Sequence, residues 1–358
     1  MLQMTRSEAR RLRLLAQGVS GASRAGGPAS GTAARRTPAD VVHRMVAMQG
    51  QDLAQVLRAI AVRSAPGTTL AEVRAAFDRG ELVRSWAMRG TLFVATPPDL
   101  AALHAAVAPR MRRQEWRMCT DGGIDERTAR RSAEALTDHL AGGPRSRRSL
   151  LAAWDAASIE TAAGRGYHLL ALHALDGLVR FGPFDGEEQL LLGGGAPPVA
   201  DPDAALTDAL RRCVAARGPT AVEDVAWWSG LPKLLVRASL ASAPGLEPVL
   251  VDGAPMLRAS DAAAGARSGV RLIPGFDEWV LGYRDRSHTA SARMLQAMVP
   301  GGNGVFKPVV LVDGRAVGTW RWPTGGRQAR EPQLQLVEPV TASTRASIHR
   351  AVEAWPHR

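Results

Sequence analysis

The sequence predicts an α+β protein built from three tandem winged-helix units and a small C-terminal β-barrel. Helical segments followed by a pair of short apolar strands with a tight turn occur three times along the chain, an order typical of a winged helix. From Val270 onward the pattern changes to short strands separated by Gly and Pro, which is typical of a small barrel. We therefore expect four domains, with bounds 1–97, 98–197, 198–262 and 263–358.

The first unit is expected to contain helices and one hairpin. Two helices carry clear start signals, a capping threonine at Thr5 and the pair Thr37-Pro38. The Gly/Ala/Ser-rich stretch 18–36 between them is expected to be a loop. The expected helices span 5–17, 37–48, 52–63 and 69–79, and the expected strands span 82–86 and 91–95, joined through 88–90.

The same order recurs in the second and third units. The second is expected to have helices at 98–119, 125–140, 146–156 and 164–175, then strands at 178–181 and 189–192. The Gly/Pro-rich segment 193–202 follows as a linker. The remaining expectations are helices at 204–217, 220–229 and 232–241, a hairpin of 247–251 with 254–259, strands at 306–312, 316–322 and 333–337, and a closing helix at 341–355.

The charge balance favours a polyanionic partner. The chain has 45 Lys and Arg residues against 34 Asp and Glu, a net charge of +11, and a pI of about 11.1. Only Lys233 and Lys307 are lysines, so codon usage in a GC-rich genome accounts for part of the arginine excess. The sign of the charge nevertheless favours nucleic acid, because neutralised phosphates release counterions.

Several classes of protein are excluded by what the sequence lacks. It has no signal peptide and no membrane span, so we expect a cytoplasmic protein. Cys119 and Cys213 stand alone, and His168 and His173 have no third ligand nearby, so we expect neither a disulfide nor a metal. There is no P-loop motif, and we expect no cofactor.

Gln49 and Gln51 are the candidate catalytic pair. Side chains at i and i+2 lie on one side only of an extended segment, so the two can converge only if the helix breaks between them, at Gly50. On its own the motif is unspecific and is most often a solvated turn. A carboxamide is a poor general base, but it can position a water molecule and donate to a base or sugar.

Other candidates have an equally plausible structural reading. Asp52 is the second choice for a base, although an Asp in this place is more often a helix cap. Trp86 and Arg89 in the first hairpin are further secondary candidates, with a core role favoured for the tryptophan. Neither lysine lies near the glutamines in sequence, so we expect no lyase activity.

Clustered arginines are the candidate phosphate contacts, although a solvated charged face is an equally good reading of any one cluster. They lie at helical spacing, in a loop entering a helix, and in the last domain: Arg110, Arg113 and Arg117; Arg145, Arg147 and Arg148; Arg321 and Arg327.

A set of motifs covering nearly the whole chain resembles the winged-helix DNA glycosylase family of the AlkZ/YcaQ type. Two positions depart from that family's pattern: Gly50 replaces an apolar residue, and Phe93 stands where many members have His. The matching motifs are Met48–Asp52, Arg84–Leu92, Ala226–Leu231, Pro274–Trp279, Gly282–Arg286, Asn303–Phe306, Val312–Arg315 and Gly318–Arg321.

The resemblance implies a C-shaped molecule with a concave channel for double-stranded DNA, and Gln49 and Gln51 as the catalytic motif. It implies excision of alkylated purines, including those in interstrand crosslinks, and the glutamine at 51 matches the branch associated with resistance to alkylating antibiotics. We therefore expect a monomeric, monofunctional DNA glycosylase for bulky N7-alkylguanine adducts. The alternative is a non-catalytic winged-helix DNA-binding protein or transcription regulator.

Overall fold

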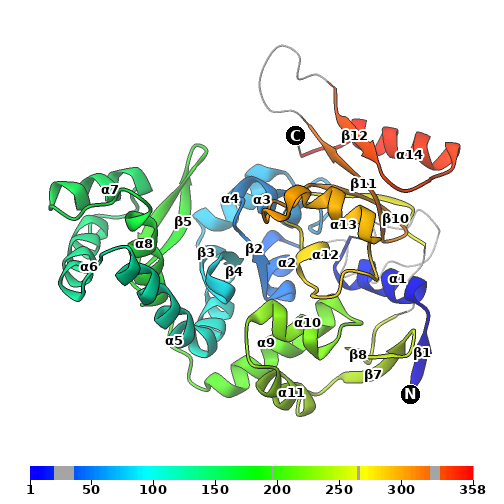
Figure 1. Cartoon of the computed structure of the whole chain (residues 1–358), viewed down its shortest axis with the longest axis horizontal. Coiled ribbons are helices and arrows are strands. Elements are labelled where there is room, and N and C mark those ends of the chain that lie inside the picture. The colour runs from blue at the N-terminus through cyan, green and yellow to red at the C-terminus, as the bar shows by residue number, and fades with distance from the viewer. Residues whose placement is uncertain (20–35, 196, 264–266, 323–330, 358) are drawn as a thin grey trace. The chain divides into compact units, whose positions relative to one another are not determined.

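A computed structural model describes residues 1–19, 36–195, 197–263, 267–322 and 331–357 (Figure 1). The chain forms two compact units. The first combines Met1–Val73 with Leu210–Arg358, and the second is Arg74–Ala209. The four domains expected from the sequence are a finer division and stay a prediction. In the parts of the chain that are described, no helix has the length and apolar character that crossing a membrane requires.

The Arg74–Ala209 unit contains two hairpins that join in one sheet. Strands β3 (Val83–Trp86) and β4 (Leu92–Ala95) are antiparallel, as are β5 (Val179–Asp185) and β6 (Glu188–Gly193), and Arg84 of β3 pairs with Phe181 of β5. Both predicted hairpins are confirmed. The helices of this unit are α5 (Pro97–Asp121), α6 (Glu126–Leu140), α7 (Arg147–Ala156) and α8 (Arg165–Leu175).

The discontinuous unit begins with β1 (Leu2–Met4), a strand that the sequence did not predict. It adds in parallel to β7 (Leu246–Val251), which pairs with β8 (Ala254–Ala259) as the predicted third hairpin. The helices of this unit include α1 (Arg6–Ala16), α2 (Pro38–Met45), α3 (Leu53–Ala61), α10 (Val222–Ser229) and α11 (Lys233–Ala241). Two further helices, α4 (Leu70–Asp78) and α9 (Pro202–Arg217), belong to it only in part, because the unit ends at Val73 and resumes at Leu210.

Both threonine start signals are confirmed. Thr5 and Thr37 each accept a hydrogen bond from the backbone N–H three residues later, at 3.3 and 3.2 Å, and the Glu8 and Asp40 carboxylates accept from the cap residues in return. These reciprocal capping boxes satisfy donors that a helix start otherwise leaves unpaired. The segment between the two helices, expected to be a loop, lies for the most part outside the described residues.

The C-terminal strands form an antiparallel sheet of order β12-β11-β10-β9, with bounds Gln333–Leu336, Arg315–Arg321, Val309–Val312 and Val270–Ile273. Among the described strands β9 and β12 are edges and do not pair, so the expected barrel is seen as an open sheet. Two helices here were not predicted, α12 (Glu278–Leu281) and α13 (Ala292–Met298).

Alternating side chains give this sheet two buried faces. Val309 and Leu311 face the cluster that contains Trp279, whereas Val310 faces α14 (Ala342–Glu353), the predicted closing helix (Figure 1). A strand has this period of two because successive side chains point to opposite faces. The sheet therefore fixes the position of the loop that leads from β9 into α12.

Candidate active site

The predicted catalytic pair lies where α2 ends, but the helix stops earlier than the sequence indicated. We expected a helix through Met48 with a break at Gly50; instead α2 ends at Met45 and Ala47–Gln49 form strand β2. The change of direction occurs at Val46, which has φ 66° and ψ −53°. Positive φ is rare for a β-branched residue. Gln49 therefore lies on extended backbone, and the break precedes both glutamines.

The two glutamines lie in different environments. Gln49 is 7% exposed, and Gln51 is exposed. Asp52 follows as the N-cap of α3, and its Oδ1 accepts a hydrogen bond from the Gln55 N–H at 3.0 Å. This confirms the capping interpretation of Asp52. Within the pair, Gln51 is therefore the more exposed side chain.

A buried carboxylate lies directly behind β2. Glu278, the first residue of α12, is 1% exposed, and its Oε1 accepts the Gln49 backbone N–H at 2.8 Å. Its Oε2 accepts from Arg217 at 2.8 Å and from the Trp228 indole N–H at 3.1 Å. Sequence reasoning did not assign Glu278 a role, although it lies in the matching motif Pro274–Trp279. Its partners are distant in the chain, so no local pattern could reveal them.

Arg217, at the end of α9, holds the turn between α2 and β2. Its guanidinium donates to the carbonyl oxygens of Met45 at 2.9 Å and Ala47 at 3.0 Å, one on each side of Val46, and lies 4.3 Å from the Trp228 ring centroid. Burial alone would lower the pKa of Arg217, but the neighbouring Cys213 and Glu278 raise it above its ordinary value. The side chain therefore stays charged.

A second buried ion pair stands beside the first. Asp277, the N-cap of α12, accepts two hydrogen bonds of 2.7 Å from Arg63 near the end of α3, and both side chains are 0% exposed. Gln17 links the two pairs: its Oε1 accepts from Arg63 at 2.9 Å, and its Nε2 donates to Tyr283 Oη at 3.0 Å. The Tyr283 hydroxyl donates to the Arg217 carbonyl at 2.7 Å. The buried polar groups behind β2 thus form one connected network.

Trp86 and Arg89 belong to the other unit. Trp86 is 2% exposed, donates its indole N–H to Tyr167 Oη at 3.0 Å, and packs against Phe181 at a ring distance of 5.9 Å. This is the core role that the sequence favoured. Arg89 has φ 59°, and its guanidinium lies 5.6 Å from the ring of Phe93, which is 0% exposed.

The candidate phosphate contacts lie on exposed surface wherever the structure describes them. Arg321 donates to Gln333 Oε1 at 2.6 Å, and Arg327 lies outside the described residues. The other candidate arginines are exposed: Arg110, Arg113 and Arg117 on α5, Arg145 just before α7, and Arg147 and Arg148 in its first turn.

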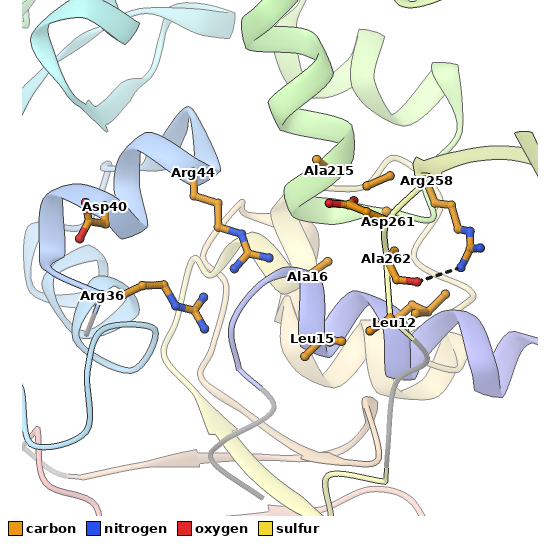
Figure 2. A pocket seen from close by; sticks show the side chains of 13 residues that line it. Leu12, Leu15, Ala16, Arg36, Asp40, Arg44, Ala215, Arg258, Asp261 and Ala262 are labelled. Atoms are coloured by element: carbon orange, nitrogen blue, oxygen red, sulfur yellow. Dashed lines mark hydrogen bonds between the residues drawn. The ribbon is translucent and has the colours of Figure 1, made fainter. Parts of the chain in front are cut away.

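A cavity of about 610 Å³ lies in the discontinuous unit between α1, α2 and the end of β8 (Figure 2). Arg36 and Arg44 point into it, and burial together with repulsion by Arg36 lowers the pKa of Arg44 to about 10. Asp40 and Asp261 line the same space, so the lining charges are of both signs. Neither glutamine lines the cavity. In the described residues no group of three or more His, Cys, Asp and Glu side chains is placed to hold a metal ion.

Three comparisons connect this geometry with known proteins. The profile of the AlkZ-like DNA glycosylase family matches residues 42–357, a segment that contains β2, α3 and α12. An interstrand DNA cross-link repair glycosylase from Streptomyces sahachiroi is 26% identical over 309 residues, which cover 78% of this chain and 81% of that protein. The structure of Streptomyces sahachiroi DNA glycosylase AlkZ matches with a TM-score of 0.75 and 21% identity, covering 98% of this chain and 96% of that one.

Proposed function

Because the chain belongs to the AlkZ-like DNA glycosylase family, we propose that it hydrolyses the N-glycosidic bond of bulky N7-alkylguanine adducts and unhooks interstrand crosslinks in double-stranded DNA. The observation that carries the proposal is the placement of Gln49 and Gln51. Both lie in the segment that the family profile matches, at the end of a strand whose backbone is anchored to a buried carboxylate.

The chemistry of the lesion suits two amides. An N7-alkylated guanine is cationic and departs as a neutral base, so the leaving group needs no strong acid. The remaining tasks are to place a water molecule and to stabilise positive charge on the sugar, and carboxamide oxygens can do both. Uracil and 1,N6-ethenoadenine are neutral lesions, and we expect little excision of either.

We assign separate roles to the residues of the motif. Gln51 is exposed and contacts the sugar or the attacking water, while the buried Gln49 completes the site from β2. Asp52 is not assigned the role of base, because Oδ1 is used to cap α3. Neither lysine is a neighbour of the glutamines in sequence, and we propose no lyase step.

The exposed arginines of α5 and α7 supply the DNA contacts in this proposal. Arg110, Arg113 and Arg117 recur at i, i+3 and i+7, so a single face of α5 presents them. Contacts with phosphate position a protein on DNA without reading its sequence. That is the behaviour expected of an enzyme that searches for damage wherever it occurs. We also propose that the units with hairpins are winged helices and that the enzyme is a monomer.

An open site explains why bulky adducts are the proposed substrates. Most glycosylases rotate a base into a closed pocket, which a crosslinked base cannot enter because it is tethered to the opposite strand. Gln51 is exposed, and the large cavity of this unit is lined by neither glutamine. We propose that the biological role is self-resistance in a producer of a DNA-alkylating metabolite.

A panel of duplex oligonucleotides, each with one defined lesion, tests the substrate class. We expect release of large N7-guanine adducts and unhooking of an N7-linked crosslink, with base release measured by mass and strand separation by denaturing gel. Efficient uracil release, or excision confined to small methylated bases, contradicts the open-site proposal. Binding to one palindromic sequence without base release indicates a regulator instead.

A further inference from the structure

We propose that Glu278 and Arg217 are a positioning pair for base excision, which sets the backbone of β2 and through it the catalytic glutamines. The inference rests on the proposed function, because it takes Gln49 and Gln51 as the residues that act on the glycosidic bond. Neither member of the pair can act on DNA directly, since each side chain is only 1% exposed.

Glu278 fixes the peptide group of Gln49. Its two carboxylate oxygens are divided between two tasks: Oε1 accepts the Gln49 N–H at 2.8 Å, and Oε2 accepts from Arg217 and Trp228. Hydrogen bonds to an ionised group are shorter and stronger than neutral ones. The two oxygens of the buried Glu278 carboxylate therefore connect β2 to Arg217 of α9 and Trp228 of α10.

Arg217 stabilises a turn that the local sequence disfavours. Val46 has φ 66°, which crowds a β-branched side chain, so this conformation persists only where surrounding contacts determine it. Arg217 supplies those contacts by binding the carbonyl oxygens on either side, those of Met45 and Ala47. Without these two hydrogen bonds from Arg217, we expect the backbone of β2 to change conformation and to displace Gln49 and Gln51 from the positions that excision requires.

Further buried hydrogen bonds restrain both members of the Glu278–Arg217 pair. The Tyr283 hydroxyl donates to the Arg217 carbonyl, and Asp277, the neighbour of Glu278 in sequence, is paired with Arg63. A misplacement of reacting groups by about 1 Å can cost about 100-fold in rate. A change at Glu278 should therefore lower the rate of the chemical step much more than it weakens DNA binding.

The test is single-turnover excision of N7-methylguanine from duplex DNA by full-length Glu278→Gln, with the DNA dissociation constant and the urea unfolding midpoint measured beside it. We expect the excision rate constant to fall about 10- to 100-fold, with the dissociation constant within about twofold of the parent. Glu247→Gln is the matched control, because Glu247 also forms an ion pair with an arginine, Arg258, and that pair lies within the β7–β8 hairpin. Its rate should equal that of the parent.

Two further measurements separate positioning from a merely structural role. In a Gln49→Ala background, Glu278→Gln should lower the excision rate much less than in the parent, because the Gln49 side chain no longer contributes to the chemical step. An equal loss of rate in both backgrounds, or a matching loss of DNA affinity, overturns the proposal. If Glu278→Gln does not fold, Trp228→Phe decides: it removes the indole donor to Glu278 and shortens the buried ring that stacks on Arg217, and we expect a loss of at least about fivefold, the value of the hydrogen bond alone.

The failure of this inference can be told apart from failure of the proposed function. If Gln49→Ala and Gln51→Ala lose activity while folded Glu278→Gln or Trp228→Phe excises at the parent rate, the positioning role is refuted and the proposed function stands. If the two glutamine variants themselves keep the parent rate, the proposed catalytic pair is wrong.

Discussion

Replacing Asp277 by Asn should destabilise the discontinuous unit strongly, because it leaves the buried Arg63 charge without the carboxylate that neutralises it. The substitution is nearly isosteric and keeps an oxygen to cap α12 at the Trp279 N–H. What it removes is the negative charge that accepts two 2.7 Å hydrogen bonds from Arg63, with both side chains 0% exposed. No solvent screens the pair, so the full effect of breaking a buried ion pair applies.

The expected loss is about 3–5 kcal/mol of unfolding free energy, the range for removing one partner of a buried pair. Urea unfolding followed by circular dichroism measures it. Asp252→Asn is the matched control, because Asp252 pairs with Arg6 at 2.8 Å in the same unit but both side chains are half exposed, at 54% and 50%. That control should lose less than about 1 kcal/mol. Equal, small losses for the two variants refute the reasoning.

Three further predictions concern a buried histidine, the two buried cysteines and one exposed arginine. Burial lowers the pKa of His173 to about 4. The neutral histidine therefore contributes about 3 kcal/mol to the free energy of unfolding above pH 6.5, and this contribution is lost as the pH falls toward 4. His173→Gln should flatten the fall in stability over that range, and an unchanged pH profile contradicts this. Burial raises the pKa of Cys119 to about 12 and of Cys213 to about 11, so neither thiol should react with iodoacetamide at pH 8 before the protein unfolds; rapid labelling of the native protein contradicts their burial. Arg113→Gln should reduce the slope of log affinity for DNA against log salt by about one, whereas Arg345→Gln, which replaces another exposed arginine, on α14, should leave the slope unchanged.

The sequence predicts local structure well where the signal is itself local. The helix starts at Thr5 and Thr37 and the hairpin of β3 with β4 need only a cap, a proline or a turn, and all three are confirmed. Strand β1 was missed because it forms by pairing with β7, which is distant in the sequence. The early end of α2 was missed because a valine gives no sign in the sequence of the positive φ that Val46 adopts, a conformation that distant contacts hold.

The candidate site shows the same division between local and distant causes. The glutamine motif and the cap at Asp52 can be identified within five consecutive residues. Glu278 and Arg217 could not be assigned a role, because their contacts with β2 join segments far apart in the chain. The expected barrel was inferred from a run of short strands separated by Gly and Pro, and such a pattern does not determine whether the first and last strands meet.

The most direct test of the central claim is single-turnover base release from a duplex that carries one N7-alkylguanine, compared among the parent, Gln49→Ala and Gln51→Ala. We predict that the parent releases the damaged base and that each variant is about 10²–10³-fold slower with DNA affinity unchanged, because each loses one positioned polar group at the reacting sugar. Release at the parent rate by both variants, or tight binding by the parent with no base released, contradicts the claim that these glutamines excise alkylated purines.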